Sequence, residues 1–561
     1  MLIRLCFLLS LLLSPLALAA TAPRQAAVAS AHPLASRAGI EVMAQGGNAF
    51  DAAITVAAVL GVVEPYSAGI GGGGFWLLQR AGDPEPVMLD ARERAPAGAH
   101  KDLFLDQDGN VDRDKAVNTA LAAGIPGQPA AFVHLAEQYG KLPLTQTLAP
   151  AIRYANEGFP VNQVYQHLAQ MRADTLRRYP ASADIFLRDG EAPTDGVIVQ
   201  ADLAQTLTRL AAKGRDGFYR GPVAERLVAG AKAAGGIWTL EDLAEYKVVE
   251  RDPIRFQYQD AVIWSAAPPS SGGVALAQMF GMLSLFNLEP KPAAERTHLL
   301  VEVMRRAYRD RALYLGDPDF VEIPIDRITS PPYLDDLASS ISMAHATPSS
   351  QLGSPVQSGS GTHTTHFSVI DTAGNRVAAT LSINLPFGSG VTVAGTGVVL
   401  NNEMDDFSAK PGSPNAYGLI GSAANAIAPG KRPLSSMTPT FMQYGPKDNR
   451  QFALIGTPGG SRIITMVLLG LLEALEGRGP QAWVDRPRFH HQYVPDEIQH
   501  EPEAFDPTLA AKLRERGHTL KDLGRTYGDM HAIRWYLKNG NVEAGSDRRR
   551  LGQALLGEPQ P

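Results

Sequence analysis

The chain has 561 residues, of which 45% are hydrophobic and 19% charged, so it is globular and neither disordered nor fibrous. This length allows two to four ordinary domains or one large unit with an extensive core. A net charge of −6 and the lack of a basic stripe argue against nucleic acid as a partner.

The first twenty residues, MLIRLCFLLSLLLSPLALAA, match a secretory signal. One arginine, an apolar run and the small residues Ala17-Leu18-Ala19 supply its three parts. An uncleaved membrane anchor is the alternative, but the apolar run is short for a span. We expect residues 1–19 to be removed, leaving a periplasmic or secreted bacterial protein without a membrane span. The single cysteine, Cys6, lies in this signal, so the mature chain has no disulfide and no thiol nucleophile.

A helix-rich start over residues 34–65 is followed by GIGGGGFWLL. Residues 69–74 satisfy the spacing G-x-G-x-x-G, but a dinucleotide-binding loop follows a strand and opens a helix. Here a helical pattern precedes the glycines and a strand-like one follows. We therefore predict a close approach of backbones at these glycines and no nucleotide cofactor.

The middle of the chain, residues 120–335, is predicted to be mainly helical. Three stretches show apolar residues at spacings i, i+3 and i+4, and their charged faces are expected to be solvated. They are ADLAQTLTRLAAKG, GPVAERLVAGAKAAGG and HLLVEVMRRAYRDRALYLGDP. PPSSGG at 268–273 is a turn between a strand-like segment and another helix.

Residues 336–363 are rich in Ser, Gly, Thr and Pro, which predicts a flexible segment. After them, HFSVID and RVAATLSIN flank TAGN and predict a β-hairpin. More short strands and two helices complete the chain. The segment that ends at His363 is therefore the one clear boundary, with residues 20–363 before it and 364–561 after it.

Thr364 can be read as the first residue of a new chain. A threonine hydroxyl needs an adjacent base to act as a nucleophile, and one known solution is its own N-terminal amine, with a pKa of about 7.7. That amine exists only if the bond between His363 and Thr364 is cut. The plainer interpretation is a β-forming residue that begins a strand. His363 and His366 face opposite sides of an extended segment, so no metal site is predicted there, and His490-His491 are interpreted as structural.

The residues from Thr364 onward resemble the small subunit of γ-glutamyltranspeptidases, also called glutathione hydrolases, of the N-terminal nucleophile hydrolase superfamily. The matching pieces are TTHFSVID, LNNEMDDFS, NAYGLIG, KRPLSSMTPT, GTPGGSRI and RPRFHHQ. Upstream pieces run in the family's order over nearly the whole mature chain: GGNAFDAA, VVEPYSAGIGGGGF, LDARERAP, AAGIPGQPAAF, YGKLPL, PPSSGG and LGDPDF.

The resemblance implies an α+β fold, a four-layer αββα sandwich built from two subunits of one autocleaved precursor. Residues 20–363 would form the large subunit, with a flexible tail from about 336, and residues 364–561 the small catalytic subunit. The two would share one core, so cleavage should not separate them. No metal and no organic cofactor is implied.

The resemblance also assigns roles. Thr364 would split the precursor at His363–Thr364 and then attack substrate, with Ser382 assisting through its hydroxyl. The backbone N–H groups of Gly459 and Gly460 would stabilise the oxyanion. The remaining implied residues bind a γ-glutamyl group: Arg92, Ser435 and Ser436 its α-carboxylate, Asn384, Glu403 and Asp406 its ammonium, and Tyr417 as the cover of the lid 411–433.

One segment departs from the family pattern. It reads Ser382-Ile383-Asn384-Leu385-Pro386, where the family usually has Thr two residues before the Asn and two small hydroxyl residues after it. Ser382 keeps a hydroxyl, so processing is expected to survive. Leu385-Pro386 removes two hydroxyls beside the ammonium site, which puts substrate preference in doubt more than chemistry.

The implied activity is γ-glutamyl transfer from glutathione or a similar compound to water, an amino acid or a dipeptide. Two alternatives remain within the superfamily: an acylase for glutaryl or β-lactam side chains, and an enzyme that cleaves poly-γ-glutamate. A third alternative, of another class, is an unprocessed binding protein, supported only by the altered 382–386 segment. A serine hydrolase of the elbow type is excluded because the chain has no G-x-S-x-G.

Overall fold

The computed structural model describes residues 20–288, 291–353, 364–410 and 412–558. The predicted signal, residues 1–19, lies outside these ranges, and so does His363. Within them, none of the helices combines the length and the apolar character that a membrane crossing requires.

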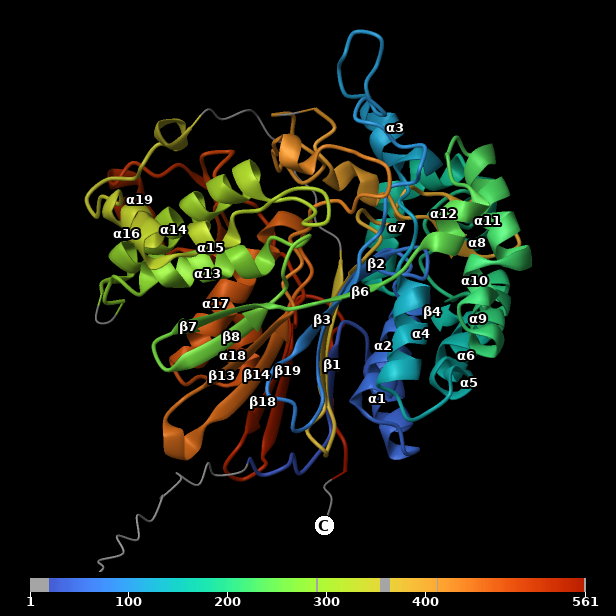
Figure 1. The fold of residues 1–561 in the computed structure, drawn as a ribbon, viewed down its shortest axis with the longest axis horizontal. Helices are drawn as coiled ribbons and strands as arrows, with labels where there is room; N and C mark the ends of the chain where they lie inside the picture. The colour runs from blue at the N-terminus through green and yellow to red at the C-terminus, as the bar shows by residue number, and fades with distance from the viewer. Residues whose placement is uncertain (1–19, 289–290, 354–363, 411, 559–561) are drawn as a thin grey trace, which may run out of the picture.

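Two antiparallel sheets form the centre of the molecule (Figure 1). The first has the strand order β20 (Gln553–Leu556), β1 (Ala27–Ser30), β9 (Thr365–Ile370), β10 (Arg376–Ser382), β2 (Gly73–Gln79), β3 (Val87–Ala91) and β6 (Val249–Arg251). The second has the order β19 (Val542–Ser546), β18 (His531–Tyr536), β14 (Gln451–Gly456), β13 (Thr440–Tyr444), β8 (Ala261–Ser265) and β7 (Ile254–Tyr258). Each sheet therefore contains strands from both sides of the predicted boundary at Thr364.

Three small sheets of two or three strands lie outside these two in the described part of the chain. They pair β11 (Thr392–Val393) with β12 (Val398–Val399), β4 (Phe159–Pro160) with β5 (Val197–Ile198), and β16 (Ile498–His500) with β15 (Phe489–His490) and β17 (Leu520–Asp522).

Helices cover the outer faces of both sheets (Figure 1). Beside the first sheet lie α1 (Pro33–Ala44), α2 (Ala49–Val63), α4 (Gln128–Gln138), α5 (Leu144–Thr147), α6 (Ala149–Glu157), α7 (Gln163–Arg177), α8 (Pro180–Phe186), α9 (Ala201–Lys213), α10 (Asp216–Tyr219), α11 (Gly221–Ala233) and α12 (Leu240–Glu245). Beside the second lie α13 (Gly272–Leu283), α14 (Ala293–Tyr314), α15 (Ile325–Ile328), α16 (Pro331–Ser339), α17 (Ile463–Leu475), α18 (Pro480–Asp485) and α19 (Pro507–Glu515), and α3 (Arg113–Val117) projects from the top. The four-layer αββα sandwich expected from the resemblance is confirmed.

Strand β9 lies in the middle of this sandwich. Its side chains alternate, as those of a strand do. Phe367 and Val369 pack with the helices of the first layer, whereas Ile370 packs into the core between the two sheets. One face of β9 therefore lies against α2, and the other lies against β14 and β18. The hairpin predicted around TAGN is confirmed, with Thr365 of β9 opposite Leu381 of β10.

The glycines of GIGGGG allow backbones to approach closely, as predicted. A Cβ atom at Gly71 would overlap the carbonyl of Val399, and one at Gly72 would overlap the carbonyl of Ser382. Gly74 has φ +157° and lies against β10 in the same way. No helix opens here, because the residues that follow form β2. The glycine loop thus fixes the end of β10, where Ser382 lies.

The expectation of solvated charged faces is wrong for α14. Five of its charged residues are buried: Glu302, Arg305, Arg306, Asp310 and Arg311. The helix packs against α13 and carries residues of the main core, so it has little free surface. Four of these five charges pair with protein groups of opposite charge, as in the ion pair of Arg306 with Glu302, whose atoms lie 2.6 Å apart.

The flexible tail expected from residue 336 does not begin there. Residues 336–339 belong to α16, and the stretch up to 353 is fastened by buried polar contacts. The Arg306 guanidinium donates to the carbonyl of Ser340 at 2.9 Å, and Asp496 accepts the backbone N–H of Ser349 at 2.7 Å. Side chains distant in sequence thus hold a segment whose composition favours disorder. Residues 354–363 lie outside the described part of the chain.

Candidate active site

Nine of the predicted site residues line one cavity where the two sheets meet the segments 403–437 and 460–463. The cavity has a volume of about 290 Å³. Its lining consists of Arg311, Thr364, Ser382, Asn384, Glu403, Asp406, Tyr417, Leu419, Ser435, Ser436, Met437, Gly460, Ser461 and Ile463.

Thr364 directly precedes β9 and is 4% exposed, and it lines the cavity. Its neighbour Thr365 is also buried but makes a different contact. The Thr365 hydroxyl donates to Oε2 of Glu64, the residue that ends α2, at 3.0 Å. Glu64 Oε1 accepts from the hydroxyl of Tyr66 at 3.3 Å. The two threonines therefore have separate environments, and of the two only Thr364 lines the cavity.

Burial raises the pKa of the Glu64 carboxyl to about 7, with a smaller contribution from the negative charge of Asp529. A carboxyl whose pKa is raised in the folded state contributes stability that is present below its unfolded pKa and is lost as the pH rises through its folded pKa. The relevant window for Glu64 is therefore pH 4.5 to about 7.

Replacing Glu64 with glutamine should remove this dependence. We expect the wild-type protein to lose about 3 kcal/mol of stability relative to Glu64→Gln between pH 4.5 and pH 7.5. Denaturant unfolding of both proteins at the two pH values measures this difference, and contributions from other carboxyls cancel. A difference in unfolding free energy that does not change with pH would contradict the titration of Glu64.

The loop Thr457-Pro458-Gly459-Gly460 lies at the start of an apolar helix. Gly459 and Gly460 have φ values of +148° and +58°, which favour glycine. Gly460 opens a 3₁₀ turn (Gly460–Arg462) that continues into α17. The N-terminal end of a helix carries partial positive charge and unpaired N–H groups, so a developing oxyanion is stabilised there.

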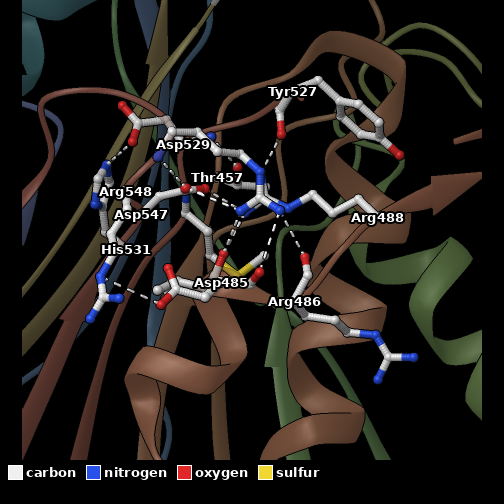
Figure 2. Close-up of polar contacts among 12 residues, drawn as sticks. Thr457, Asp485, Arg486, Arg488, Tyr527, Asp529, His531, Asp547 and Arg548 are labelled. Atoms are coloured by element: carbon white, nitrogen blue, oxygen red, sulfur yellow. Dashed lines mark hydrogen bonds and ion pairs between the residues drawn. The ribbon is translucent and has the colours of Figure 1, made fainter. Parts of the chain in front are cut away.

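A buried polar cluster supports this loop from behind (Figure 2). The backbone N–H of Asp529 donates to Oγ1 of Thr457 at 3.2 Å. The Arg488 guanidinium donates to the carboxylate of Asp547 and to the carbonyl of Tyr527, just upstream of Asp529. Arg488 and Asp547 are both buried, so this network links the loop to the C-terminal strands of the second sheet.

Two acceptors without partners lie on the side of the cavity formed by Asn384 and Glu403. Among the described residues, Oδ1 of Asn384 and Oε1 of Glu403 are buried and receive no hydrogen bond. The Asn384 side-chain nitrogen donates to the carbonyl of Asn402 at 2.8 Å, which orients the amide. Burial raises the pKa of Glu403 to about 7, although Arg92 opposes the shift. This wall can accept hydrogen bonds from a cation such as an ammonium group.

Arg92 lies behind these acids and not in the cavity lining. Its Nη1 is 2.8 Å from Oε2 of Glu403, its Nη2 is 2.6 Å from Oδ2 of Asp406, and its Nε donates to a backbone carbonyl at 3.2 Å. Burial lowers the pKa of Arg92, but Glu403 and Asp406 outweigh this effect and raise it. Three of its five N–H donors are thus used, and two remain.

Ser435 and Ser436 form another part of the wall, and PPSSGG braces them. The Ser271 hydroxyl and backbone N–H both donate to the carbonyl of Ser435, at 2.7 and 2.8 Å. The Oγ of Ser436 accepts a hydrogen bond from Arg311 at 3.2 Å. The predicted turn therefore positions the serine pair.

Tyr417 closes the cavity from the lid. Its side chain is 5% exposed, and its hydroxyl donates to the backbone carbonyl of Asn384 at 2.9 Å. Asp405 and Asp406 fasten the preceding residues, because Asp406 accepts from Asn415 at 3.0 Å and Asp405 accepts the N–H of Ala416 at 2.8 Å. Tyr417 therefore covers the cavity beside Asn384.

The sequence prediction missed two charged groups. Arg311 was assigned to a solvated helix face, and its only sequence signal was its position in a stretch that leads into LGDPDF. Glu93, next to Arg92, has both carboxylate oxygens buried without a hydrogen-bond partner among the described residues. Burial and the charge of Glu403 raise the pKa of Glu93 well above its usual range, and Arg92 opposes this shift.

One cluster in the described ranges has residue types that bind metals: His298, Glu302 and His518. Most of its polar atoms have protein partners, whereas Nδ1 of His518 has none among the described residues. Nδ1 of His298 lies 2.7 Å from Nε2 of His518, and Oε2 of Glu302 is paired with Arg306. A cation would compete with that guanidinium, and we interpret the cluster as structural.

Two antiparallel sheets stacked between helical layers, with a threonine at the head of a central strand facing an enclosed polar cavity, define the architecture of the N-terminal nucleophile hydrolases. The model of the Gamma-glutamyltranspeptidase family matches residues 35–557. The chain therefore belongs to the γ-glutamyltranspeptidase family.

Characterised relatives and solved structures agree with this assignment. The chain is 41% identical to the glutathione hydrolase proenzyme of Escherichia coli K12, over 95% of this chain and 92% of that protein. It is 40% identical to the corresponding proenzyme of Pseudomonas aeruginosa, over 95% of both. A cephalosporin acylase from Bacillus halodurans superposes with a TM-score of 0.83 at 28% identity, over 98% of this chain and 99% of that chain. A chain of Helicobacter pylori γ-glutamyltranspeptidase gives a TM-score of 0.56 at 39% identity, over 57% of this chain and 93% of that chain.

Proposed function

We propose that this protein is a γ-glutamyltransferase and glutathione hydrolase that becomes active when its own chain is cut before Thr364. The observation that carries the proposal is a polar cavity that contains Thr364 and is able to receive both charges of an amino acid. Asn384 and Glu403 offer unpartnered acceptors for an ammonium group. Hydroxyl donors for a carboxylate are provided by Ser435 and Ser436, and Arg92 lies behind Glu403 and Asp406 with two N–H donors left.

The reaction proceeds in two steps. The Thr364 oxygen attacks the γ-carbonyl carbon of the donor, its proton passes to the α-amine of Thr364, and the oxyanion lies near the N–H groups of Gly459 and Gly460. The C–N bond then breaks, and the leaving amine takes the proton from that ammonium. In the second step water, an amino acid or a dipeptide attacks the γ-glutamyl ester, and the Thr364 hydroxyl is restored.

Cleavage between His363 and Thr364 would produce a large subunit (20–363) and a small subunit (364–561). Both central sheets contain strands from the two parts, so the subunits would stay together after cleavage. The Helicobacter pylori chain supports this division, because it matches a little over half of this chain, the share expected of a separate large subunit. Export to the periplasm or beyond rests on the first twenty residues alone.

Processing and donor choice together test the function. Electrophoresis should give two bands, with the smaller one beginning at Thr364 by N-terminal sequencing. The purified protein should hydrolyse γ-glutamyl-p-nitroanilide faster than glutaryl-p-nitroanilide, which lacks the ammonium group. A clear preference for the glutaryl compound would favour an acylase. A single band near 60 kDa that persists for days would favour an unprocessed binding protein.

A further inference from the structure

Arg311 brings a second guanidinium to the cavity. It lies on the last turn of α14, is 4% exposed and belongs to the cavity lining. Its Nε donates to the hydroxyl of Ser271 at 3.0 Å, and its Nη2 donates to the hydroxyl of Ser436 at 3.2 Å. Ser271 also donates to the carbonyl of Ser435. Arg311 is therefore connected to both Ser435, through Ser271, and Ser436, directly.

Unlike Arg92, Arg311 has no carboxylate within ion-pair distance in the described ranges. Burial lowers the pKa of Arg311 to about 10, while Tyr308 and the negative charge of Asp406 oppose this shift and the positive charge of Arg92 adds to it. The group is still protonated at neutral pH. A buried cation without a carboxylate at ion-pair distance is costly, and an anion placed beside it relieves that cost.

The neutral partners of Arg311 leave it available to a ligand. Two hydroxyl groups accept two of its five N–H donors, so its remaining donors can meet an incoming carboxylate. The ammonium acceptors Asn384 and Glu403 line the same cavity. A donor that carries both charges can therefore place its ammonium at one wall and its carboxylate at the other.

We propose that Arg311, together with Ser436, binds the α-carboxylate of the γ-glutamyl donor directly. This inference rests on the proposed function. Arg92 lies behind the cavity wall and holds Glu403 and Asp406 in place. Arg311 is then a specificity-determining residue that favours substrates with an α-carboxylate.

Three anilides separate this role from a purely structural one. γ-Glutamyl-p-nitroanilide carries both charges, glutaryl-p-nitroanilide carries the carboxylate only, and 4-aminobutyryl-p-nitroanilide carries the ammonium only. In Arg311→Gln, kcat/KM for the γ-glutamyl compound should fall by about 100-fold, mostly through KM, as expected when one partner of a buried charge pair is removed. The glutaryl compound should suffer a similar loss, whereas the 4-aminobutyryl compound should change by less than about 3-fold, since it makes no such pair.

Arg309→Gln is a matched control on the same helix. Arg309 lies two residues before Arg311 but does not line the cavity, and its ion-pair partner is Asp310. Processing and turnover of all three anilides should match the wild-type protein. Arg311→Lys keeps the charge but loses the planar fork, so its loss on the γ-glutamyl compound should lie between those of the wild-type protein and Arg311→Gln.

Equal losses of kcat/KM on all three anilides would show that Arg311 only holds the segment around Ser435 and Ser436 in place. No loss on any of them would also overturn the inference. If Arg311→Gln does not fold or process, Arg311→Lys decides. Its ratio of kcat/KM for the γ-glutamyl compound to kcat/KM for the 4-aminobutyryl compound should then be lower than that of the wild-type protein, and an unchanged ratio would overturn the inference. Failure of the proposed function is recognised separately, because the wild-type protein would then not prefer γ-glutamyl-p-nitroanilide.

Discussion

Replacing Thr364 with alanine is expected to leave the chain in one piece and to abolish turnover of γ-glutamyl donors. The same hydroxyl cuts the precursor and attacks substrate, so its removal blocks both events. Loss of a nucleophile in a comparable hydrolase costs about 10⁶-fold in kcat, and here the uncut chain also lacks the α-amine that serves as base. Electrophoresis over several days and release of p-nitroaniline measure the two losses.

Two neighbouring changes test the specificity of this result. Thr364→Ser keeps a hydroxyl at the head of β9, so processing and part of the turnover should remain. Thr365→Val removes the hydroxyl that donates to Glu64 but leaves Thr364 intact, so the chain should still be cut at the same bond. Cutting before residue 364 in Thr364→Ala would assign processing to another group. Loss of processing in Thr365→Val alone would exchange the roles of the two threonines.

Much of the architecture around Thr364 can be predicted from sequence because it depends on local signals. The hairpin formed by β9 and β10 follows from two alternating segments around TAGN. The close backbone approach at the glycine loop 69–74 also follows from local signals, because the flanking pattern runs from helix to strand. The order of the strands within the sheets does not depend on local signals. It pairs β1 with β20 and β9, strands that are hundreds of residues apart, and only the resemblance to a family predicts it.

Prediction fails where tertiary packing overrides composition. The charged residues of α14 have the spacing of a surface helix, yet α13 and the core cover them, and Arg311 consequently points to a cavity and not to solvent. Residues 336–353 have the composition of a linker but are held by Arg306 and Asp496. In both cases the partner is far away in sequence, and periodicity carries no information about it.

For the candidate site, the sequence predicts which residues take part but not how they are paired. The resemblance selected nine residues that do line one cavity, including Ser382 and Tyr417. It did not indicate that Arg92 holds two carboxylates while Arg311 holds none. Which of two arginines is neutralised by protein acids depends on a few ångströms of packing. That distinction decides which guanidinium is left for a substrate, and only the structure provides it.

Replacing Arg92 with methionine is expected to destabilise the protein by about 3–5 kcal/mol at pH 8, the usual cost of leaving a buried charge without its partner. Arg92 is fully buried and pairs with Glu403 and Asp406, with Glu93 also nearby at 3.6 Å. Methionine fills much of the space of the aliphatic stem but supplies no charge. Denaturant unfolding of the purified variant measures the loss, and donor turnover should fall with it because the ammonium wall loses its support.

The pH dependence of that loss identifies its cause. Burial raises the pKa of Glu403 to about 7 even though Arg92 lowers it, so removing the arginine raises this pKa further. The stability linked to such a carboxyl is present below its unfolded pKa and is lost as the pH rises. Arg92→Met should therefore be much closer to the wild-type protein at pH 5 than at pH 8. Arg178→Met, which removes an exposed pair with Asp114, should cost less than about 1 kcal/mol at either pH. An equal loss at both pH values in Arg92→Met would mean that packing of the stem, and not charge, makes Arg92 important.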